Sequence, residues 1–405
     1  MLTFRLAFRN VFRQKRRTLL TVLTMLGGFA MASISIAWSD GTYSRIIDMF
    51  TRNRIGHIQV HSAGYLDRPS LYKTIDHYRQ VGRVIAETKG VVAWAPRLLS
   101  AGIVQVGDKS ATAQIIGIDP TLERRATRFD KKIIEGQPLA TEASHQVVLG
   151  DMLADLLKAR VGDTALIVSQ GADGSIANDL YVIAGTASSG DDMTDRSAFY
   201  LHISDAQELL VQPDQAHEIV IVANDIDDVE DMILGLAESL DNSNLAIDSW
   251  QTVAKSFYDA MRVDQEGNAI TLFVIMLVVA VGVLNTVLMT VLERTREYGM
   301  LRAVGTQPML IIRLVLYEVF FMAVISIVLG IFVALPGNYL LMIYGIKMPQ
   351  ALSYGGVTFS HLYSELNIRS YVIPAITVVI SALVVGLFPA IRAARTAPAR
   401  AMRMH

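Results

Sequence analysis

Four long apolar runs divide the chain into alternating apolar and polar parts. They cover residues 18–38, 269–292, 314–335 and 371–391, and the only Asp, Glu, Lys or Arg inside them is Glu318, near the start of the third run. A helix needs about 20 apolar residues to cross a hydrocarbon core of about 30 Å. The pattern predicts an α-helical membrane protein with four transmembrane helices, one before and three after a long polar segment.

Charge at the chain ends predicts the orientation of these spans. Residues 1–17 carry six Lys or Arg and residues 392–405 carry four, in both cases without an acid. Basic flanking segments stay in the cytoplasm, so both termini are expected inside. Residues 39–268 hold 34 acidic and 20 basic side chains, which suits a soluble acidic domain outside the membrane.

The resulting order of segments is one interface helix, four spans and their connections. We expect a cytoplasmic amphipathic helix at 1–17, spans at 18–38, 269–292, 311–336 and 371–391, an extracytoplasmic domain at 39–268, a cytoplasmic coupling segment at 293–310, a short extracytoplasmic loop at 337–370 and a cytoplasmic tail at 392–405.

The N-terminal region has two readings. A basic stretch followed by an apolar run is also typical of a cleaved signal peptide, but the apolar part of a signal peptide is about 7–15 residues long. The run here has 21 residues, which favours an uncleaved anchor. Before it, Phe4, Phe8, Val11 and Phe12 share one helical face and arginines share another, as in a helix that lies in the membrane interface.

The polar segment predicts a large mixed α/β domain on a helical stalk. The expected strands are 58–61, 102–106, 112–118, 165–169, 180–183 and 218–222, and the expected helices are 148–158 and 229–240. The run Gly171–Gly174 predicts a hairpin turn. Apolar stripes at 46–50 and 253–261 indicate two stalk helices that continue the first two spans; ordinary loops are the alternative.

Motifs for chemistry are absent from the sequence. There is no G-x-x-x-x-G-K-[ST] phosphate loop, no G-x-S-x-G elbow, no H-E-x-x-H and no cysteine. His57 and His61 have a spacing that suits a metal only on a helix, whereas they flank an expected strand, so solvated strand histidines are the preferred interpretation. A membrane-anchored enzyme is therefore the least favoured function, and turnover by residues 39–268 alone would revive it.

Two polar residues lie inside the apolar runs. Asn285 and Glu318 are costly in lipid, and such residues normally face a neighbouring helix or a cavity. Glu318 lies about one turn after Arg313, so an interfacial ion pair competes with a functional role. Asn285 is a candidate for a helix contact.

The segment ERTREYGMLRAVGTQP, residues 293–308, is charged although apolar runs flank it on both sides. Its first turn is charged, and Tyr298, Met300, Leu301 and Val304 form an apolar edge. Gly299 and Gly305 permit sharp bends and the following proline favours a new element. A short amphipathic helix on the inner membrane face is expected.

This segment resembles the signature of the MacB/LolE/FtsX superfamily of permeases, roughly E-R-x-x-E-I-G-x-L-R-A-x-G-A. The matching residues are Glu293, Arg294, Glu297, Gly299, Leu301, Arg302, Ala303 and Gly305, while Tyr298 and Thr306 depart conservatively. The resemblance extends to R-N-x-x-R-x-x-R-R-T at residues 9–18 and to the ending P-A-I-R-A-A-R-T-A-P-A-R-A-M-R. It implies a mechanotransmission permease in the inner membrane of a bacterium.

The resemblance also implies partners. In this family a coupling helix sits in a groove of a separate ATPase, so two ATPase chains that bind ATP and Mg²⁺, and a second permease subunit in a homodimer or heterodimer, are expected. No cofactor is expected on this chain itself, and no nucleic-acid partner. The implied coupling residues are Glu293, Arg294, Glu297, Tyr298, Gly299, Leu301, Arg302 and Gly305.

Three functions compete within the resemblance. The strand Gly56–Val60 resembles the lipoprotein-releasing LolC/LolE branch, in which acyl chains enter beside the first two spans and a periplasmic carrier receives the cargo. Val274, Leu277 and Val278 are candidate cargo-facing residues, with ordinary helix packing as the alternative. Efflux through an outer-membrane duct ranks second, and regulation of a cell-wall hydrolase ranks third.

Overall fold

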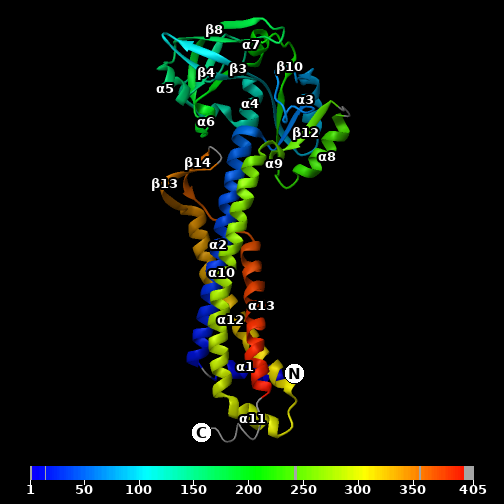
Figure 1. Cartoon of the computed structure of the whole chain (residues 1–405), viewed down its shortest axis with the longest axis vertical. Coiled ribbons are helices and arrows are strands. Elements are labelled where there is room, and N and C mark those ends of the chain that lie inside the picture. The colour runs from blue at the N-terminus through cyan, green and yellow to red at the C-terminus, as the bar shows by residue number, and fades with distance from the viewer. Residues whose placement is uncertain (1, 14, 241–243, 355–356, 396–405) are drawn as a thin grey trace. The chain divides into compact units, whose positions relative to one another are not determined.

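The computed structural model describes residues 2–13, 15–240, 244–354 and 357–395. The chain forms two compact units (Figure 1). The first comprises residues 1–44, 262–349 and 361–405, and the second comprises residues 45–261 and 350–360.

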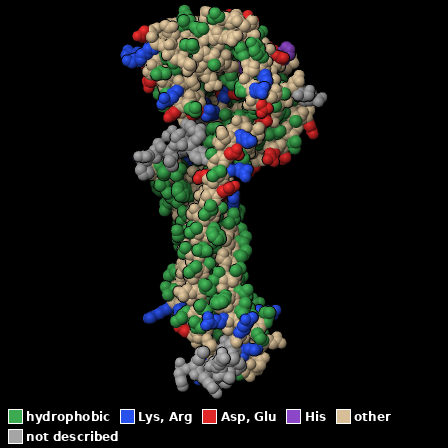
Figure 2. Space-filling model, viewed as in Figure 1, with side chains coloured by type: hydrophobic (Ala, Val, Ile, Leu, Met, Phe, Trp, Pro, Cys, Tyr) green, Lys and Arg blue, Asp and Glu red, His purple; other side chains and the backbone are tan. Residues whose placement is uncertain are grey.

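Helices build the first unit. They are α1 (Leu2–Val11), α2 (Lys15–Phe50), α10 (Lys255–Glu293), α11 (Thr295–Ala303), α12 (Pro308–Tyr344) and α13 (Arg369–Ala394). In the described part of the chain, α2, α10, α12 and α13 are long and apolar enough to cross a membrane. Apolar side chains dominate the middle of these helices, and Lys and Arg gather near the end where α11 lies (Figure 2). The fold is that of a four-helix membrane protein, as the sequence predicts.

Details of α1 and of the region after α12 differ from expectation. The helix α12 continues past residue 336 to Tyr344, and the region expected as a short loop also contains β13 (Ile346–Tyr354) and β14 (Val357–Leu362), which pair with each other. Phe4 and Phe8 of α1 and the following Phe12 are about half exposed, whereas Val11 is buried at 3% exposure. Val11 therefore belongs to the packed face of this region and not to the exposed aromatic face.

The second unit is a mixed α/β domain. Its strands are β1 (Ile58–Ser62), β2 (Ile75–Asp76), β3 (Val91–Val106), β4 (Lys109–Ile118), β5 (Ile133–Gly136), β6 (Gln146–Gly150), β7 (Thr164–Gln170), β8 (Ile176–Ala187), β9 (Ala198–His202), β10 (Gln215–Ala216), β11 (Glu218–Ala223) and β12 (Leu245–Ser249). Its helices are α3 (Tyr78–Glu87), α4 (Pro120–Thr127), α5 (Asp151–Leu157), α6 (Asp192–Asp195), α7 (Ile203–Leu209), α8 (Val229–Leu240) and α9 (Trp250–Val253), with a π-helix η1 (Thr51–Ile55) and a 3₁₀ turn η2 (Phe129–Lys132).

The long strand β3 joins two parts of one ten-stranded sheet. Its first half pairs with β11, which leads through β1 to β12 at the edge. Its second half pairs with β4 and β7, and the pairings β4–β9, β9–β6, β6–β8 and β8–β7 return to it. Six strands thus pair in a closed circuit, which leaves no free edge among them.

Alternating side chains along these strands supply the main core. Fully buried apolar residues of one sheet face pack with residues of the covering helices, among them Leu98 and Val104 of β3, Ile115 of β4, Ile219 of β11 and Ile85 of α3. This is the period-two pattern of a half-buried sheet. The opposite face of the central strands carries polar and charged side chains. This face lines a cavity of the outer domain.

Most expected elements are present, with one clear error. The predicted helix 229–240 coincides with α8, and the turn at Gly171–Gly174 joins β7 to β8. The predicted helix 148–158 was wrong at its start, because residues 148–150 complete β6 and the helix α5 begins only at Asp151. Val148 and Leu149 are fully buried, and a buried apolar run of this length is compatible with either a strand or a helix.

The stalk segments are helical. In the second unit, α2 ends at Phe50 and α10 begins at Lys255, and the rings of Phe50 and Phe257 stack with their centroids 4.2 Å apart. Val253 belongs to the separate short helix α9, so the expected stripe at 253–261 is split between two helices.

Candidate functional site

The charged segment after α10 forms a turn and a short helix. Arg294 separates α10 from α11, and the hydroxyl of Thr295 donates to the carbonyls of Val291 (3.1 Å) and Leu292 (2.7 Å) at the helix end. The segment therefore consists of the nine-residue α11 and a loop to Pro308, which is the first residue of α12.

The two glycines of the segment play different parts. Gly305 has φ +97°, a conformation that other residues rarely adopt. It allows the chain to turn sharply just after α11. Gly299 lies inside α11, is buried and has an ordinary helical backbone. The sequence-based expectation of a bend at Gly299 was wrong.

A buried ion pair lies behind α11. The Nη1 atom of Arg294 is 2.9 Å and 3.1 Å from the two carboxylate oxygens of Glu318 on α12, and the residues are only 9% and 7% exposed. Asn10 of α1 donates to the same carboxylate at 2.6 Å. Glu318 therefore pairs with Arg294 and not with Arg313, the partner that the sequence suggested.

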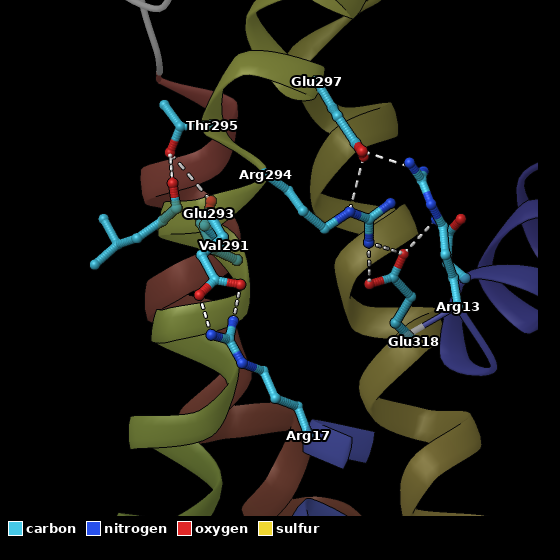
Figure 3. A network of polar contacts seen from close by, with 10 residues as sticks. Arg13, Arg17, Val291, Glu293, Arg294, Thr295, Glu297 and Glu318 are labelled. Atoms are coloured by element: carbon cyan, nitrogen blue, oxygen red, sulfur yellow. Dashed lines mark hydrogen bonds and ion pairs between the residues drawn. The ribbon is translucent and has the colours of Figure 1, made fainter. Parts of the chain in front are cut away.

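Three further ion pairs, all more exposed, surround this one (Figure 3). Glu297 accepts from Arg294 Nε at 2.9 Å and pairs with Arg13 at 3.1 Å. Glu293, the last residue of α10, pairs with both terminal nitrogens of Arg17 at the start of α2. The network therefore ties α1, α2, α10, α11 and α12 together at one end of the helical unit.

Tyr298 fills the space next to the buried pair. It is 1% exposed, and its ring lies 5.5 Å from the Arg294 guanidinium. Burial and the neighbouring Glu318 raise the pKa of the Tyr298 phenol, so it stays neutral. The sequence placed this residue on an apolar edge together with Leu301, whereas the structure puts it on the buried face.

The remaining apolar edge of α11 faces outward. Met300 is 49% exposed, Leu301 41% and Val304 88%. These side chains line one wall of a groove of about 380 Å³, and Leu6 and Arg13 from the α1 region contribute to the other wall. Arg302 instead donates to the carbonyl of Thr306 at 3.1 Å, which closes the turn after α11.

The candidate cargo-facing residues lie on the open side of α10. Val274 is 52% exposed, Leu277 53% and Val278 63%. None of the three is buried against another helix of the described chain. Asn285, on the same helix, is also exposed. It is therefore not buried in a helix contact within the described chain.

His57 immediately precedes β1, and His61 lies within it. Within the described residues no group of three or more His, Cys, Asp or Glu side chains could hold a metal ion. His57 and His61 are 3% and 1% exposed, so the interpretation as solvated histidines was wrong. Burial lowers the pKa of both, and His57 Nδ1 accepts a hydrogen bond from the Ala223 amide at 3.0 Å.

Several partners in the network were missed at the level of sequence. Asn10, Arg13 and Arg17 belong to the R-N-x-x-R-x-x-R-R-T run, in which Asn10 lies on α1, Arg17 lies on α2 and Arg13 lies between the two helices. The density of basic residues in this run was an available signal, although it does not say which acid each residue meets.

Comparisons with known proteins agree with this architecture. The family model described as the MacB-like periplasmic core domain matches residues 18–235, and the one described as the FtsX-like permease C-terminal matches residues 269–398. The chain is similar to the lipoprotein-releasing system transmembrane protein LolC of Neisseria meningitidis serogroup B, with 20% identity over 98% of each chain. It is similar to LolE of Haemophilus influenzae, with 23% identity over 93% of this chain and 92% of that one.

One solved structure with a similar outer domain is the periplasmic region of MacB from Actinobacillus actinomycetemcomitans. It covers 49% of this chain and 91% of its own length, with 17% identity and a TM-score of 0.37.

Proposed function

The chain belongs to the MacB/LolE/FtsX superfamily of ABC transporter permeases, near its LolC/LolE branch, and we propose that it uses ATP hydrolysis by a separate ATPase to release lipoproteins from the inner membrane. The observation that carries the proposal is the two-sided character of α11. On its buried side, the ion pair of Arg294 with Glu318 holds it in place. Its other side is the exposed apolar edge formed by Met300, Leu301 and Val304.

The exposed edge suits a protein partner. Met300, Leu301 and Val304 are apolar, adjacent and exposed, and they border a groove. Burial of apolar surface drives most protein association, and methionine is enriched at protein interfaces. In this proposal each ATPase subunit receives α11, while ATP and Mg²⁺ bind to the ATPase.

The buried face transmits the motion. Arg294 is bonded to Glu318 of α12 and to Glu297 of α11, and the carboxylate of Glu318 is bonded to Asn10 of α1. A displacement of α11 therefore moves α1 and α12 with it, because breaking a buried ion pair is costly. Glu293 at the end of α10 continues the connection into the second span.

The cargo in this proposal is a lipidated protein whose acyl chains contact α10. Val274, Leu277 and Val278 present an exposed apolar surface on the helix. Each CH₂ group that leaves the bilayer costs about 0.8 kcal/mol, so extraction requires an energy source and an apolar surface that receives the chains. A second permease subunit completes the site, and a periplasmic carrier accepts the cargo.

Co-purification tests the proposal. The chain is expressed with the ATPase encoded beside its gene, solubilised gently, and every protein and lipid that accompanies it is identified. The expected result is an ATPase complex that carries an acylated protein and releases it when ATP is added. A complex with a periplasmic adaptor or a hydrolase, and without lipidated cargo, would move the function to efflux or regulation.

A pair of variants tests the docking edge. Val304→Asp places a charge on the apolar edge and is expected to abolish co-purification of the ATPase. The matched control is Leu234→Asp, because Leu234 is 66% exposed on α8 of the outer domain. Equal ATPase recovery with both variants would contradict the assignment of α11 as the docking element.

A further inference from the structure

An open pocket of about 300 Å³ lies at the end of the helical unit where α2 begins. It is lined by Lys15, Arg16 and Arg17 of the first turn of α2 and by Glu293 at the end of α10. The segments that form this end of the unit are strongly basic, because residues 2–17 and 293–318 together carry ten Lys or Arg and three Glu. An excess of positive charge of this kind attracts anions.

The three carboxylates of these segments are already engaged. Glu293 accepts hydrogen bonds from both terminal nitrogens of Arg17 (Figure 3). Glu297 and Glu318 both accept from Arg294, in the network described above. The acids at this end of the unit are therefore compensated by other cations and do not neutralise the rest of the pocket.

Lys15 and Arg16 are the cations of the pocket that remain. Both side chains are exposed, and neither forms an ion pair with an acid in the described part of the chain. The first turn of α2 contains no acidic residue, so only Arg17 is relieved of the repulsion between three adjacent positive charges. A guanidinium fork matches the oxygens of a phosphate, and a lysine adds a point charge. The pair therefore suits a phosphate group.

An open apolar stripe follows these cations along α2. Leu20, Leu23 and Met31 lie four, seven and fifteen positions after Arg16, spacings that place all of them on one helical face. All three are exposed, and a Cβ atom added at Gly27, between them, would meet no atom within 4 Å. The stripe from Leu20 to Met31 rises about 16 Å, which is about half of a hydrocarbon core of about 30 Å.

Pocket and stripe together match a membrane lipid. Because α2 is long and apolar enough to cross a membrane, its apolar stripe lies at the depth of acyl chains and its basic first turn at the depth of headgroups. A free phosphate would contact the cations alone. A phospholipid whose phosphate reaches Lys15 and Arg16 has its acyl chains beside the stripe.

We propose that this pocket binds a phospholipid with an anionic headgroup, whose phosphate is held by Lys15 and Arg16 and whose acyl chain lies along Leu20 and Leu23. The site is separate from the proposed cargo surface on α10. The inference goes beyond the proposed function and does not depend on it.

Photo-crosslinking of the full chain in phosphatidylcholine nanodiscs tests this inference. The probe is a trace of phosphatidylglycerol that carries a diazirine on an acyl chain, close to the headgroup, and the control probe is phosphatidylcholine with the same acyl chain. The expected result is labelling of residues 18–31 that is about tenfold stronger with phosphatidylglycerol, because only its headgroup carries a net negative charge. Equal labelling by both probes would overturn the inference. So would the absence of labelling by either, which would show that a protein partner covers this face.

Matched double variants separate the pocket from the general positive charge of this end. Lys15→Gln with Arg16→Gln is expected to lower labelling by phosphatidylglycerol about tenfold, to the level of the control probe. Labelling by the control probe should stay the same. Arg5→Gln with Arg9→Gln removes as many exposed cations from α1, outside the pocket, and should change the labelling less than about twofold. Equal losses in the two double variants would assign the effect to diffuse attraction and overturn the site.

Competition distinguishes a lipid from other anions. Inorganic phosphate, added in excess at constant ionic strength, should leave the labelling unchanged because it makes no contact with the stripe. Loss of labelling on adding phosphate would assign the pocket to a soluble anion. Loss of labelling on adding the purified ATPase would assign Lys15 and Arg16 to a protein partner. Either loss would overturn the inference.

Discussion

Arg294 lies next to an apolar span and makes three contacts to carboxylate oxygens. Its guanidinium meets both oxygens of Glu318 and one oxygen of Glu297. Because Arg294 is only 9% exposed, it offers little surface to a partner. It instead connects the start of α11 to Glu318 of α12. In the proposed coupling to an ATPase, its part is therefore to position α11.

Removing either charge of the buried pair should destabilise the helical unit. Arg294→Met leaves the Glu318 carboxylate buried without its cation, for which the typical cost is about 3–5 kcal/mol. We expect a clear fall in the apparent Tm of the purified chain, measured by intrinsic fluorescence in detergent.

A control and a double variant isolate the cause. Arg13→Ala removes an ion pair whose arginine side chain is 66% exposed, so its cost is expected to be about 0–1 kcal/mol. Arg294→Met combined with Glu318→Leu removes both charges and should recover part of the lost stability. If Arg294→Met and Arg13→Ala lower Tm equally, the buried pair is not the stabilising contact.

Lys132 should titrate far below an ordinary lysine. Its pKa of about 8 results from burial, with Glu123 and Asp195 opposing the shift and Arg97 and Arg54 adding to it. In the unfolded chain the value is about 10.4. Between these pH values the unfolded state binds more protons, so the contribution of Lys132 to stability rises with pH across this window.

Competitive amine labelling measures this titration. The rate of modification of Lys132 by an acylating reagent, followed by peptide mass spectrometry, should reach half its maximum near pH 8. A half-maximum above pH 10 would show that burial does not dominate the environment of this ammonium, and would contradict the shift described here.

At the scale of elements, small residues set how closely α2 and α10 approach. A Cβ atom at Gly28 would lie 2.0 Å from Val279 Cγ2, and one at Gly282 would lie 2.7 Å from Thr24 Cγ2. Small residues at such contacts let membrane helices pack tightly. Farther along, Asn268 of α10 donates to the Ser39 hydroxyl of α2 at 2.9 Å, which adds a polar contact to the same helix pair.

Two neighbouring glycines allow a matched test of this contact. Gly28→Ala must push α2 away from α10, and overpacking of this kind costs about 1–3 kcal/mol. Gly27→Ala has no atom within 4 Å of the added Cβ, so it should be neutral or slightly stabilising, because alanine favours a helix. The measurement is the apparent Tm of each variant. Equal effects would show that α2 and α10 are not in close contact here.

For the whole molecule, the two compact units differ in the solvent that each suits. The helices α2, α10, α12 and α13 expose apolar side chains over much of their length, whereas the α/β unit buries its apolar residues in a core of its own. An apolar surface of this extent is typical of a protein that is surrounded by lipid. The predicted topology follows from this contrast and from the basic flanks of the spans.

The absence of cysteine from the sequence permits a clean topology test. Single substitutions are made at exposed positions: Ser175→Cys in the turn between β7 and β8, Arg296→Cys on α11, and Val281→Cys on α10 in the middle of the predicted span 269–292. In intact spheroplasts a membrane-impermeant maleimide should label only the first. The second should react only after the membrane is opened, and the third on neither side. Labelling of Arg296→Cys from outside would reverse the proposed orientation.

The reach of sequence-based reasoning differed between the two units. The spans were predictable because a run of apolar residues carries the signal locally, whatever the rest of the chain does. The start of α5 was not predictable in this way. Val148 and Leu149 are apolar residues of β6, and its partner strands, β8 and β9, lie far away in the sequence. The long strand β3 was predicted only for its last five residues, since its first half pairs with β11, more than a hundred residues later.

The sequence by itself determined the class of the protein, the number of its spans and the special character of residues 293–308, because hydropathy, charge bias and a short motif are all local properties. Only the tertiary structure decided that Glu318 meets Arg294, that Tyr298 is buried, and that Arg97, Lys132 and Glu218 line one cavity. Such contacts join residues that are distant along the chain, and their partners are selected by the packing of helices and the register of strands.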